Sequence, residues 1–313
     1  MKTIKEITEF AKLFKLNIPV NEHFEYYIQT LSHSFEFRDI VALVNNYSDF
    51  EDWLKENGYN NVGHYKMGYV YELILNHLKS SQAYLKCQEF DYSTFKFYER
   101  DLLKIHEGNF MLSLDISSAN FQAMKIFDQD NELKSSWKEL CDSLKIHPVI
   151  SSSKSFRQVL FGNLNPKRFQ KIQHRNMIML AEELEKAFSM EEVISISHDE
   201  IIMNLGEDQK DAHQKANMIL KAVESIRAQR LEKCEPWMGL GSKIFTINKI
   251  AKGIYVKTIF FLVEDSIVES YKTLFGCPGN MFYMYFKKHI LGKEVEERDC
   301  LFSIENRLAK WII

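Results

Sequence analysis

The chain has 313 residues, a formal net charge of −3, 45% hydrophobic residues and 27% charged residues. This composition is that of an ordinary globular protein, and the length predicts two or three subdomains. The near-neutral charge excludes a global basic field as the basis of nucleic-acid binding, so such an activity would need a local basic cleft.

The cysteines and the apolar segments indicate the compartment. Five cysteines are scattered without a C-x-x-C pair, which argues against a disulfide framework and a structural zinc site. The N-terminus lacks the apolar core of a signal peptide, and the most apolar stretch, Ile254 to Val263, is too short to span a bilayer. We therefore expect a cytoplasmic protein without a membrane partner, in the host cytoplasm if a virus or phage encodes it.

The N-terminal third predicts helices. Residues 1–105 combine polar–apolar periodicity with few breakers, as in Asn61 to Leu85. Phe110 to Ile116 (FMLSLDI) is a short β-prone run with an acidic residue next to its end. Helices are then expected over Ala119 to Asp128 and Leu133 to Leu144.

The middle of the chain predicts two helices and a hairpin. Ser151–Ser153 offer N-caps for a helix that ends near Leu164, and Pro166 suits the first turn of the next helix, Lys167 to Phe188. The segment from Val193 to Leu205 (VISISHDEIIMNL) has charged residues between two apolar runs. This order predicts a β-hairpin with acidic residues at its tip.

The last third begins with a predicted helix, Gln209 to Arg230, and a loop from Glu235 to Gly241 that contains a proline and two glycines. Strand-like runs follow at Lys243 to Ile247 and Gly253 to Val263, and then a helix-rich tail. In this tail, core packing is favoured over base stacking for the aromatic side chains of Phe282, Tyr283, Phe286 and Trp311. The basic side chains of Lys287, Lys288 and Arg298 could contact phosphates.

Three short segments carry the residue types that phosphoryl transfer needs. In the first, LDISSANFQ, Asp115 closes a strand before a Ser-rich turn into a helix. In the second, Lys154, Arg157 and Phe161 are three and four residues apart, so one helix face carries two cations and an aromatic ring. The third, SHDEI, puts Asp199 and a second acid at the hairpin tip.

Brought together, these residues predict nucleotidyl transfer. Two carboxylates can hold two Mg²⁺ ions about 4 Å apart, which activate the attacking hydroxyl and stabilise the leaving pyrophosphate. Helix cations can neutralise a triphosphate, and an aromatic ring can stack on a base. Oxygen ligands suit Mg²⁺, with Mn²⁺ as a substitute. Each segment alone has a simpler explanation, namely a polar turn, a helix N-cap, or a solvated or buried helix face.

The same segments, in the same order, resemble the three palm-domain motifs of family A DNA polymerases. SHDEII resembles motif C, V-H-D-E-[LI], and RQVLFG at 157–162 resembles motif B, K-x-x-x-F-G. DISSANFQ resembles motif A, D-Y-S-Q-I-E-L-R. It is as close to the D-G-S-x-x-x-x-Q of single-subunit phage-type RNA polymerases, with Asp115, Ser117 and Gln122 in place. The resemblance covers residues 112–205, under a third of the chain.

The resemblance implies a role for each polar residue of the first and third segments. Asp115 and Asp199 would bind the metal ions. Glu200 would be the neighbouring acid with a lesser role, and His198 would contact the primer end.

For the incoming nucleotide, the resemblance implies that Arg157 holds the triphosphate and that Phe161 packs on the base or sugar. Lys154 stands next to the position of a family arginine, here a serine, and would substitute for it. Gln122 matches the phage-type motif. Asn120 falls where the family has a glutamate that blocks a ribose 2′-hydroxyl, which favours ribonucleotide or mixed use.

A basic stripe follows the second segment on the next predicted helix. A solvated face is the default interpretation, and template contact is the alternative. The stripe consists of Lys167, Arg168, Lys171, His174 and Arg175.

The expected fold is α+β, a small antiparallel palm sheet flanked by helices, with an N-terminal helical region and a C-terminal α+β module. Residues 1–105 would form a thumb-like region, 106–235 the palm with minimal fingers, and 236–313 an accessory module. The short intervals between the motifs favour a primase or a small accessory polymerase of a phage or mobile element over a processive replicase.

The expected function is therefore template-directed nucleotidyl transfer in DNA replication. The partners would be nucleoside triphosphates, a single-stranded template, with DNA favoured over RNA, and other replication proteins. Two alternatives stay open. One is a template-independent terminal transferase, and the other is a non-catalytic nucleic-acid-binding or replication scaffold that keeps the palm fold.

Overall fold

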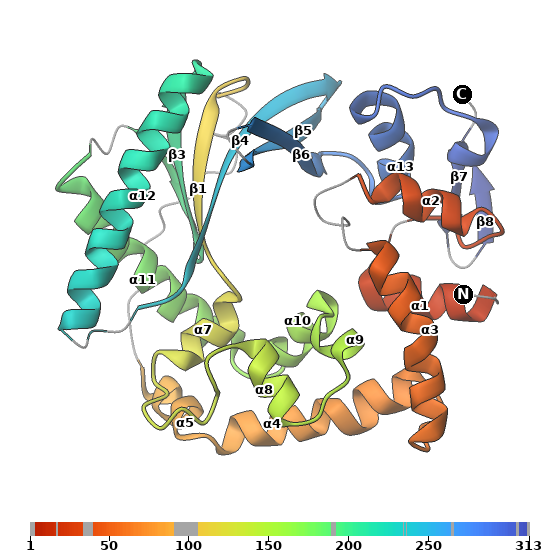
Figure 1. The fold of residues 1–313 in the computed structure, drawn as a ribbon, viewed down its shortest axis with the longest axis horizontal. Coiled ribbons are helices and arrows are strands. Elements are labelled where there is room, and N and C mark those ends of the chain that lie inside the picture. Colours follow the sequence, from red (N-terminus) through yellow and green to blue (C-terminus); the bar gives the residue numbers. More distant parts are fainter. Residues whose placement is uncertain are drawn as a thin grey trace.

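The protein has an α+β fold built around one antiparallel sheet, which confirms the expected class. The computed structural model describes residues 4–16, 18–33, 40–90, 106–188, 192–233, 235, 237–263, 266–304 and 307–311. Six strands follow the order β2-β3-β1-β4-β5-β6, and each neighbouring pair is antiparallel (Figure 1). The strands are β1 (Phe110–Ile116), β2 (Val193–Ile196), β3 (Glu200–Gly206), β4 (Leu240–Ala251), β5 (Ile254–Val263) and β6 (Ser266–Phe275).

Helices dominate the described part of the N-terminal region, as predicted, while residues 91–105 lie outside the described part. In Figure 1 this region runs from the right side of the molecule along its base. None of the described helices, here or later in the chain, is long and apolar enough to cross a membrane. The N-terminal elements are α1 (Ile4–Phe14), α2 (Phe24–Leu31), α3 (Ile40–Glu56), the π-helical η2 (His64–Val70), α4 (Tyr71–Ser80) and α5 (Gln82–Glu89).

Polar side chains set the beginnings of the central helices. Ser153 accepts a hydrogen bond from the backbone N–H three residues later at 3.2 Å, and Asn165 does the same at 3.3 Å, just before Pro166. The helix expected from Leu133 begins later, because Ser136 caps it in the same way. The helices are α7 (Ala119–Lys125), α8 (Trp137–Ser143), α9 (Pro148–Ser151), α10 (Lys154–Gly162), α11 (Pro166–Glu185) and α12 (Gln209–Glu232).

The sheet has two faces of different character. Helices α11 and α12 pack on one face of the sheet (Figure 1). This face carries apolar side chains such as Leu112, Leu114 and Ile201, which join the main core. Because successive residues of a strand point to opposite faces, Ser113 and Asp115 lie on the other face. We call this the acid-bearing face. It includes Met111, Ser113 and Asp115 of β1, Glu200 and Ile202 of β3, Lys243 and Phe245 of β4, and Lys257 and Ile259 of β5.

Strands β4 to β6 correct the expected domain boundary at residue 236. β4 pairs with β1, from Met111 opposite Phe245 to Ile116 opposite Leu240. Residues 240–275 are therefore part of the same sheet as β1 and β3, and not of a separate module. The reason is that β1 has two edges whose backbone groups need partners: β3 pairs with one edge, and β4 pairs with the other.

The rest of the C-terminal region packs on α2. The Tyr27 hydroxyl donates to the carbonyl oxygen of Arg298 at 2.7 Å, and the Tyr283 hydroxyl donates to Thr30 Oγ1 at 3.0 Å. Both chain ends therefore lie on the same side of the molecule (Figure 1). The elements are η4 (Gly279–Met281), α13 (Phe282–Tyr285), the π-helical η5 (Phe286–Ile290), η6 (Glu297–Cys300), β7 (Leu301–Ile304) and β8 (Arg307–Lys310).

Two cations of this region, left open as phosphate contacts, bind acids of the chain itself. Lys287 Nζ donates to Asp299 Oδ2 at 2.5 Å and to the Tyr26 hydroxyl at 2.6 Å. Arg298 pairs with Glu296 at 2.8 Å. Burial lowers the pKa of Lys287, but its hydrogen bonds to Asp299 and Tyr26 raise the pKa above its ordinary value overall. Lys287 is thus a structural cation.

Candidate functional site

The acids of the first and third segments meet at one end of the sheet. β1 and β3 are adjacent, and their register puts Asp115 directly opposite Glu200. Side chains of directly opposite residues share one face, with Cβ atoms roughly 5 Å apart. The Ser113 hydroxyl donates to Glu200 Oε1 at 2.6 Å and so holds this carboxylate on the acid-bearing face.

Asp199 belongs to the turn that joins β2 to β3. The backbone N–H of Ser197 donates to the Glu200 carbonyl at 2.8 Å, and the Ser197 hydroxyl accepts from the Glu200 N–H at 3.1 Å. The same hydroxyl donates to Asp199 Oδ1 at 3.3 Å. The carbonyl oxygen of Asp199 accepts from the N–H of Ile116 at 2.8 Å. The hairpin predicted from the sequence is therefore present, and its tip lies against the end of β1.

A lysine from β4 approaches the same acids. Lys243 Nζ lies 3.8 Å from Asp115 Oδ2, with 22% of the lysine side chain and 36% of the aspartate side chain exposed. Gly241 is the residue opposite Asp115 on β4, and a Cβ atom there would lie 3.4 Å from Ser117 Oγ. The missing side chain leaves room beside the acid. Sequence reasoning missed Lys243, because nothing local indicates that β4 pairs with β1.

The donor set at this end of the sheet suits Mg²⁺ in chemical type. Carboxylate oxygens are hard ligands, and Mg²⁺ is commonly held by one or two carboxylates together with substrate phosphates and water. Among the residues that the structure describes, no three His, Cys, Asp or Glu side chains are placed to hold one metal ion. A Mg²⁺ ion held by Asp115 and Asp199 would therefore need phosphate and water oxygens to complete its coordination.

Two histidines support the hairpin tip. His174 of α11 is buried, and its Nδ1 lies 3.2 Å from the carbonyl oxygen of Ser197. Its ring packs edge-on against the exposed ring of His198, with centroids 5.6 Å apart. Partial desolvation and the neighbouring His174 lower the pKa of His198, which favours the neutral imidazole. The expectation that His174 belongs to a solvated stripe was wrong, because α11 turns this position towards the sheet.

Helix α10 presents its predicted residues differently from expectation. Phe161 is fully buried, 5.8 Å from the ring of Trp137 and 5.9 Å from that of Phe169 by centroids. It is a core residue, which corrects the prediction that it packs on a nucleotide. Arg157 is half-buried, and this burial lowers its pKa, while Lys154 is exposed. The helix therefore offers cations but no aromatic ring at Phe161.

Ser153, at the start of α10, has a structural role. Ser153 and Ser155 both donate to the carbonyl oxygen of Leu13, at 3.1 and 2.8 Å. These bonds satisfy a carbonyl at the end of α1 and fix the two helices together. The position is used for structure and not for a cation.

The two polar residues predicted on α7 are partly buried. Asn120 Oδ1 accepts a hydrogen bond from Gln173 Nε2 of α11 at 2.8 Å. Gln122 lies near the loop before β4, since a Cβ atom on Gly239 would be 3.6 Å from its Nε2. Asn120 is therefore held by α11, which fixes the start of α7 against that helix.

The basic stripe on α11 is divided between surface and packing. Lys167 and Arg175 are exposed, whereas Arg168 and Lys171 are half-buried. The Arg175 guanidinium lies over the ring of Phe90 at 5.6 Å. Only part of the stripe is therefore presented to solvent.

The structure thus places Asp115 and Glu200, from two predicted segments, side by side. Lys243 and His174 also lie at this site, whereas Phe161 belongs to the core. No protein-family model matches the sequence, and no curated protein matches it. A function is therefore inferred from the geometry of these residues.

Proposed function

We propose that the protein is a template-directed nucleotidyltransferase, a primase or small accessory polymerase that joins nucleoside triphosphates on a single-stranded nucleic acid. The observation that carries the proposal is the strand register that sets Asp115 opposite Glu200, with Asp199 in the adjoining turn. Residues far apart in the sequence supply these acids. Acids from distant segments at one end of a sheet support two-metal phosphoryl transfer, because that reaction needs carboxylates gathered around the metal ions.

In this proposal, Asp115 and Asp199 hold Mg²⁺, which supplies activation of the attacking hydroxyl and stabilisation of the leaving pyrophosphate when bound. Glu200, kept in place by Ser113, sets the negative potential beside them. Lys243, on the other side of Asp115, provides a cation on the same face for a phosphate oxygen.

Other groups would position the substrates. Neutral His198 can donate a hydrogen bond to the primer end from the exposed tip of the hairpin. Arg157 and Lys154 of α10 would bind the triphosphate, and the exposed Lys167 and Arg175 of α11 would contact the template. The N-terminal helices would grip the template and primer.

The test is nucleotide incorporation. The purified protein is incubated with single-stranded DNA, labelled NTPs or dNTPs, and Mg²⁺, and extended products are measured. Asp115→Asn and Asp199→Asn should each reduce incorporation by about 10²–10³-fold or more, because each removes a charge that acts on the transition state. Asp142→Asn, at the exposed end of α8, is the matched control and should retain activity. Full activity in both site variants would refute the proposal.

A second candidate is a nucleic-acid-binding scaffold without turnover. It is favoured by the lysine 3.8 Å from Asp115 and by the buried position of Phe161. It predicts binding of single-stranded DNA without incorporation at any concentration of Mg²⁺ or Mn²⁺. A terminal transferase, in contrast, would incorporate nucleotides in an order that does not follow an added template.

A further inference from the structure

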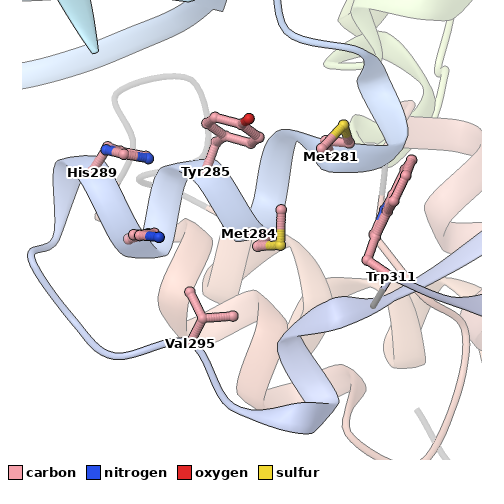
Figure 2. A pocket seen from close by; sticks show the side chains of 7 residues that line it. Met281, Met284, Tyr285, His289, Val295 and Trp311 are labelled. Carbon is pink, nitrogen blue, oxygen red and sulfur yellow. The ribbon is translucent and has the colours of Figure 1, made fainter. Parts of the chain in front are cut away.

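The C-terminal region contains a pocket of about 160 Å³ that has no part in the proposed reaction. One helical face contributes most of its wall: Met284, Tyr285, Lys288 and His289 follow Met281 by three, four, seven and eight positions. Figure 2 shows His289 and Tyr285 on one side, Met284 and Met281 between, and Trp311 on the other. The lining consists of Met281, Met284, Tyr285, Lys288, His289, Val295 and Trp311.

Adjacent lysines on this helix have opposite environments. Lys287 is 4% exposed and holds the buried carboxylate of Asp299. Lys288 is exposed at the pocket, and no carboxylate in the described part of the chain forms an ion pair with it. Lys287 thus stabilises the fold, whereas Lys288 is presented to solvent beside an apolar cavity.

The imidazole of His289, also in the lining, favours its neutral form at neutral pH. Burial and the neighbouring Lys288 lower the pKa of His289. Its ring stacks on that of Tyr285, with centroids 5.3 Å apart and planes 23° apart. The pocket therefore combines flat rings and two thioethers with a single positive charge.

This combination selects a flat ring that carries a negative group. Aromatic and thioether side chains bind ring faces and edges well. An apolar cavity of about 150 Å³ is known to accept benzene, so the volume here fits one six-membered ring better than a fused pair. Lysine binds phosphate as a point charge. Unpaired nucleotides have both features.

We propose that this pocket binds one unstacked base of a single-stranded nucleic acid, with a pyrimidine preferred, and that Lys288 contacts the adjoining phosphate. The choice of ligand rests on the proposed function, and the pocket would be a template contact of that enzyme. The structure also explains why this pocket could not be predicted from the sequence. Phe286 and Tyr283, on the opposite face of the helix, are buried, while Tyr285 and Trp311 line the cavity.

The test measures binding alone. Fluorescence anisotropy of labelled oligo(dT) and oligo(dA) is recorded with EDTA and without nucleotides, over a range of salt concentrations. Trp311→Ala should weaken oligo(dT) binding roughly 5- to 160-fold, the range for loss of one base–aromatic contact. Lys288→Ala should lower the slope of log affinity against log salt by about 1. Lys293→Ala, an exposed lysine of the same segment outside the lining, should change neither.

Further measurements keep the result interpretable. Since Trp311 stacks on Phe302 at 4.9 Å, its removal could loosen β7 and β8, so Lys288→Ala serves as the surface variant that leaves packing intact. Photo-cross-linking of a 5-iodouracil oligonucleotide should map to Tyr285 or Trp311 by mass spectrometry.

The outcomes separate this inference from the proposed function. If wild-type protein incorporates nucleotides but both variants bind oligo(dT) like wild type, the pocket inference is overturned and the function stands. If binding depends on Lys288 and Trp311 but no condition supports incorporation, the pocket stands and the function does not. Binding of a tryptophan-containing peptide in the pocket, with no response to oligonucleotide, would also overturn the inference.

Discussion

Two aspartate–lysine pairs in this molecule are built in opposite ways. Asp299 and Lys287, both in the C-terminal region, form a contact of 2.5 Å beside Tyr26 of α2, with side chains 0% and 4% exposed. Asp115 and Lys243 lie 3.8 Å apart on the acid-bearing face, with side chains 36% and 22% exposed. The first pair has a short N–O distance and is buried, and the second has a longer N–O distance and is partly exposed to solvent.

The surroundings of the two aspartates explain the contrast. Asp299 accepts from the Tyr26 hydroxyl at 3.0 Å and from the backbone N–H of Glu296 at 2.7 Å, in addition to Lys287. A buried carboxylate needs such a set, because the loss of water is otherwise uncompensated. Asp115 keeps access to water, so a ligand can reach it without dismantling the fold. The buried pair therefore maintains the structure, whereas the open pair lies where a ligand can reach it.

The largest predicted effect is on the buried pair. Asp299→Ala would leave the ammonium group of Lys287 buried without its main partner. Breaking a buried ion pair from one side costs about 3–5 kcal/mol. We expect a loss of this size in the free energy of unfolding, measured by urea denaturation followed by circular dichroism.

The double variant sharpens this test. Lys287→Met combined with Asp299→Leu removes both charges and retains side-chain volume, so it should be much less destabilised than Asp299→Ala alone. Glu297→Ala, which breaks an exposed pair with Lys310, is the control and should leave stability unchanged. If the single and double variants lost equal stability, the buried charge would not be the cause.

The open pair should respond in function and hardly in stability. Lys243→Ala should change the free energy of unfolding by about 0–1 kcal/mol, as is usual for a partly exposed pair. If Lys243 meets a phosphate of the nucleic acid, the salt dependence of binding should fall by about 1 in slope. Both quantities are measurable on one preparation, by denaturation and by fluorescence anisotropy.

Lys221→Ala is the matched control for this variant. Lys221 is exposed on α12, which covers the opposite face of the sheet, so its removal should leave the salt slope unchanged. A large loss of stability in Lys243→Ala with an unchanged slope would show that Lys243 belongs to the same structural class as Lys287.

The hairpin could be predicted from sequence because the information is local. Apolar runs on both sides of His198 fix two strands, and Ser197 closes the turn through its own backbone and hydroxyl. The three-and-four spacing on α10 is also local, but it fixes only which residues share a side of the helix. Arg157 and Phe161 could therefore be grouped correctly while the buried position of Phe161 was missed.

Long-range pairings could not be predicted in this way. Lys243 reaches Asp115 only because β4 pairs with β1 in one register, with Ser113 opposite Lys243. A shift of one residue would move Lys243 to the helix-covered face. Likewise, the sequence around Lys287 gives no sign that Asp299, beyond a helix end, will neutralise it. Such partners depend on the complete fold.

The smallest predicted effect concerns His198, which lies beside the open pair at the hairpin tip. Burial and His174 lower its pKa below the ordinary value of about 6.5, while Asp199 acts in the opposite direction. Below pH 6.5 the unfolded chain therefore binds a proton that the folded hairpin does not, and stability is lost as pH falls towards the lowered pKa. Urea denaturation at pH 7.5 and 5.5 should show a larger loss in wild type than in His198→Gln, which has no such proton to bind. Equal losses in the two proteins would mean that the imidazole at the tip is fully hydrated, and that the hairpin is as open there as Asp115 is on the acid-bearing face.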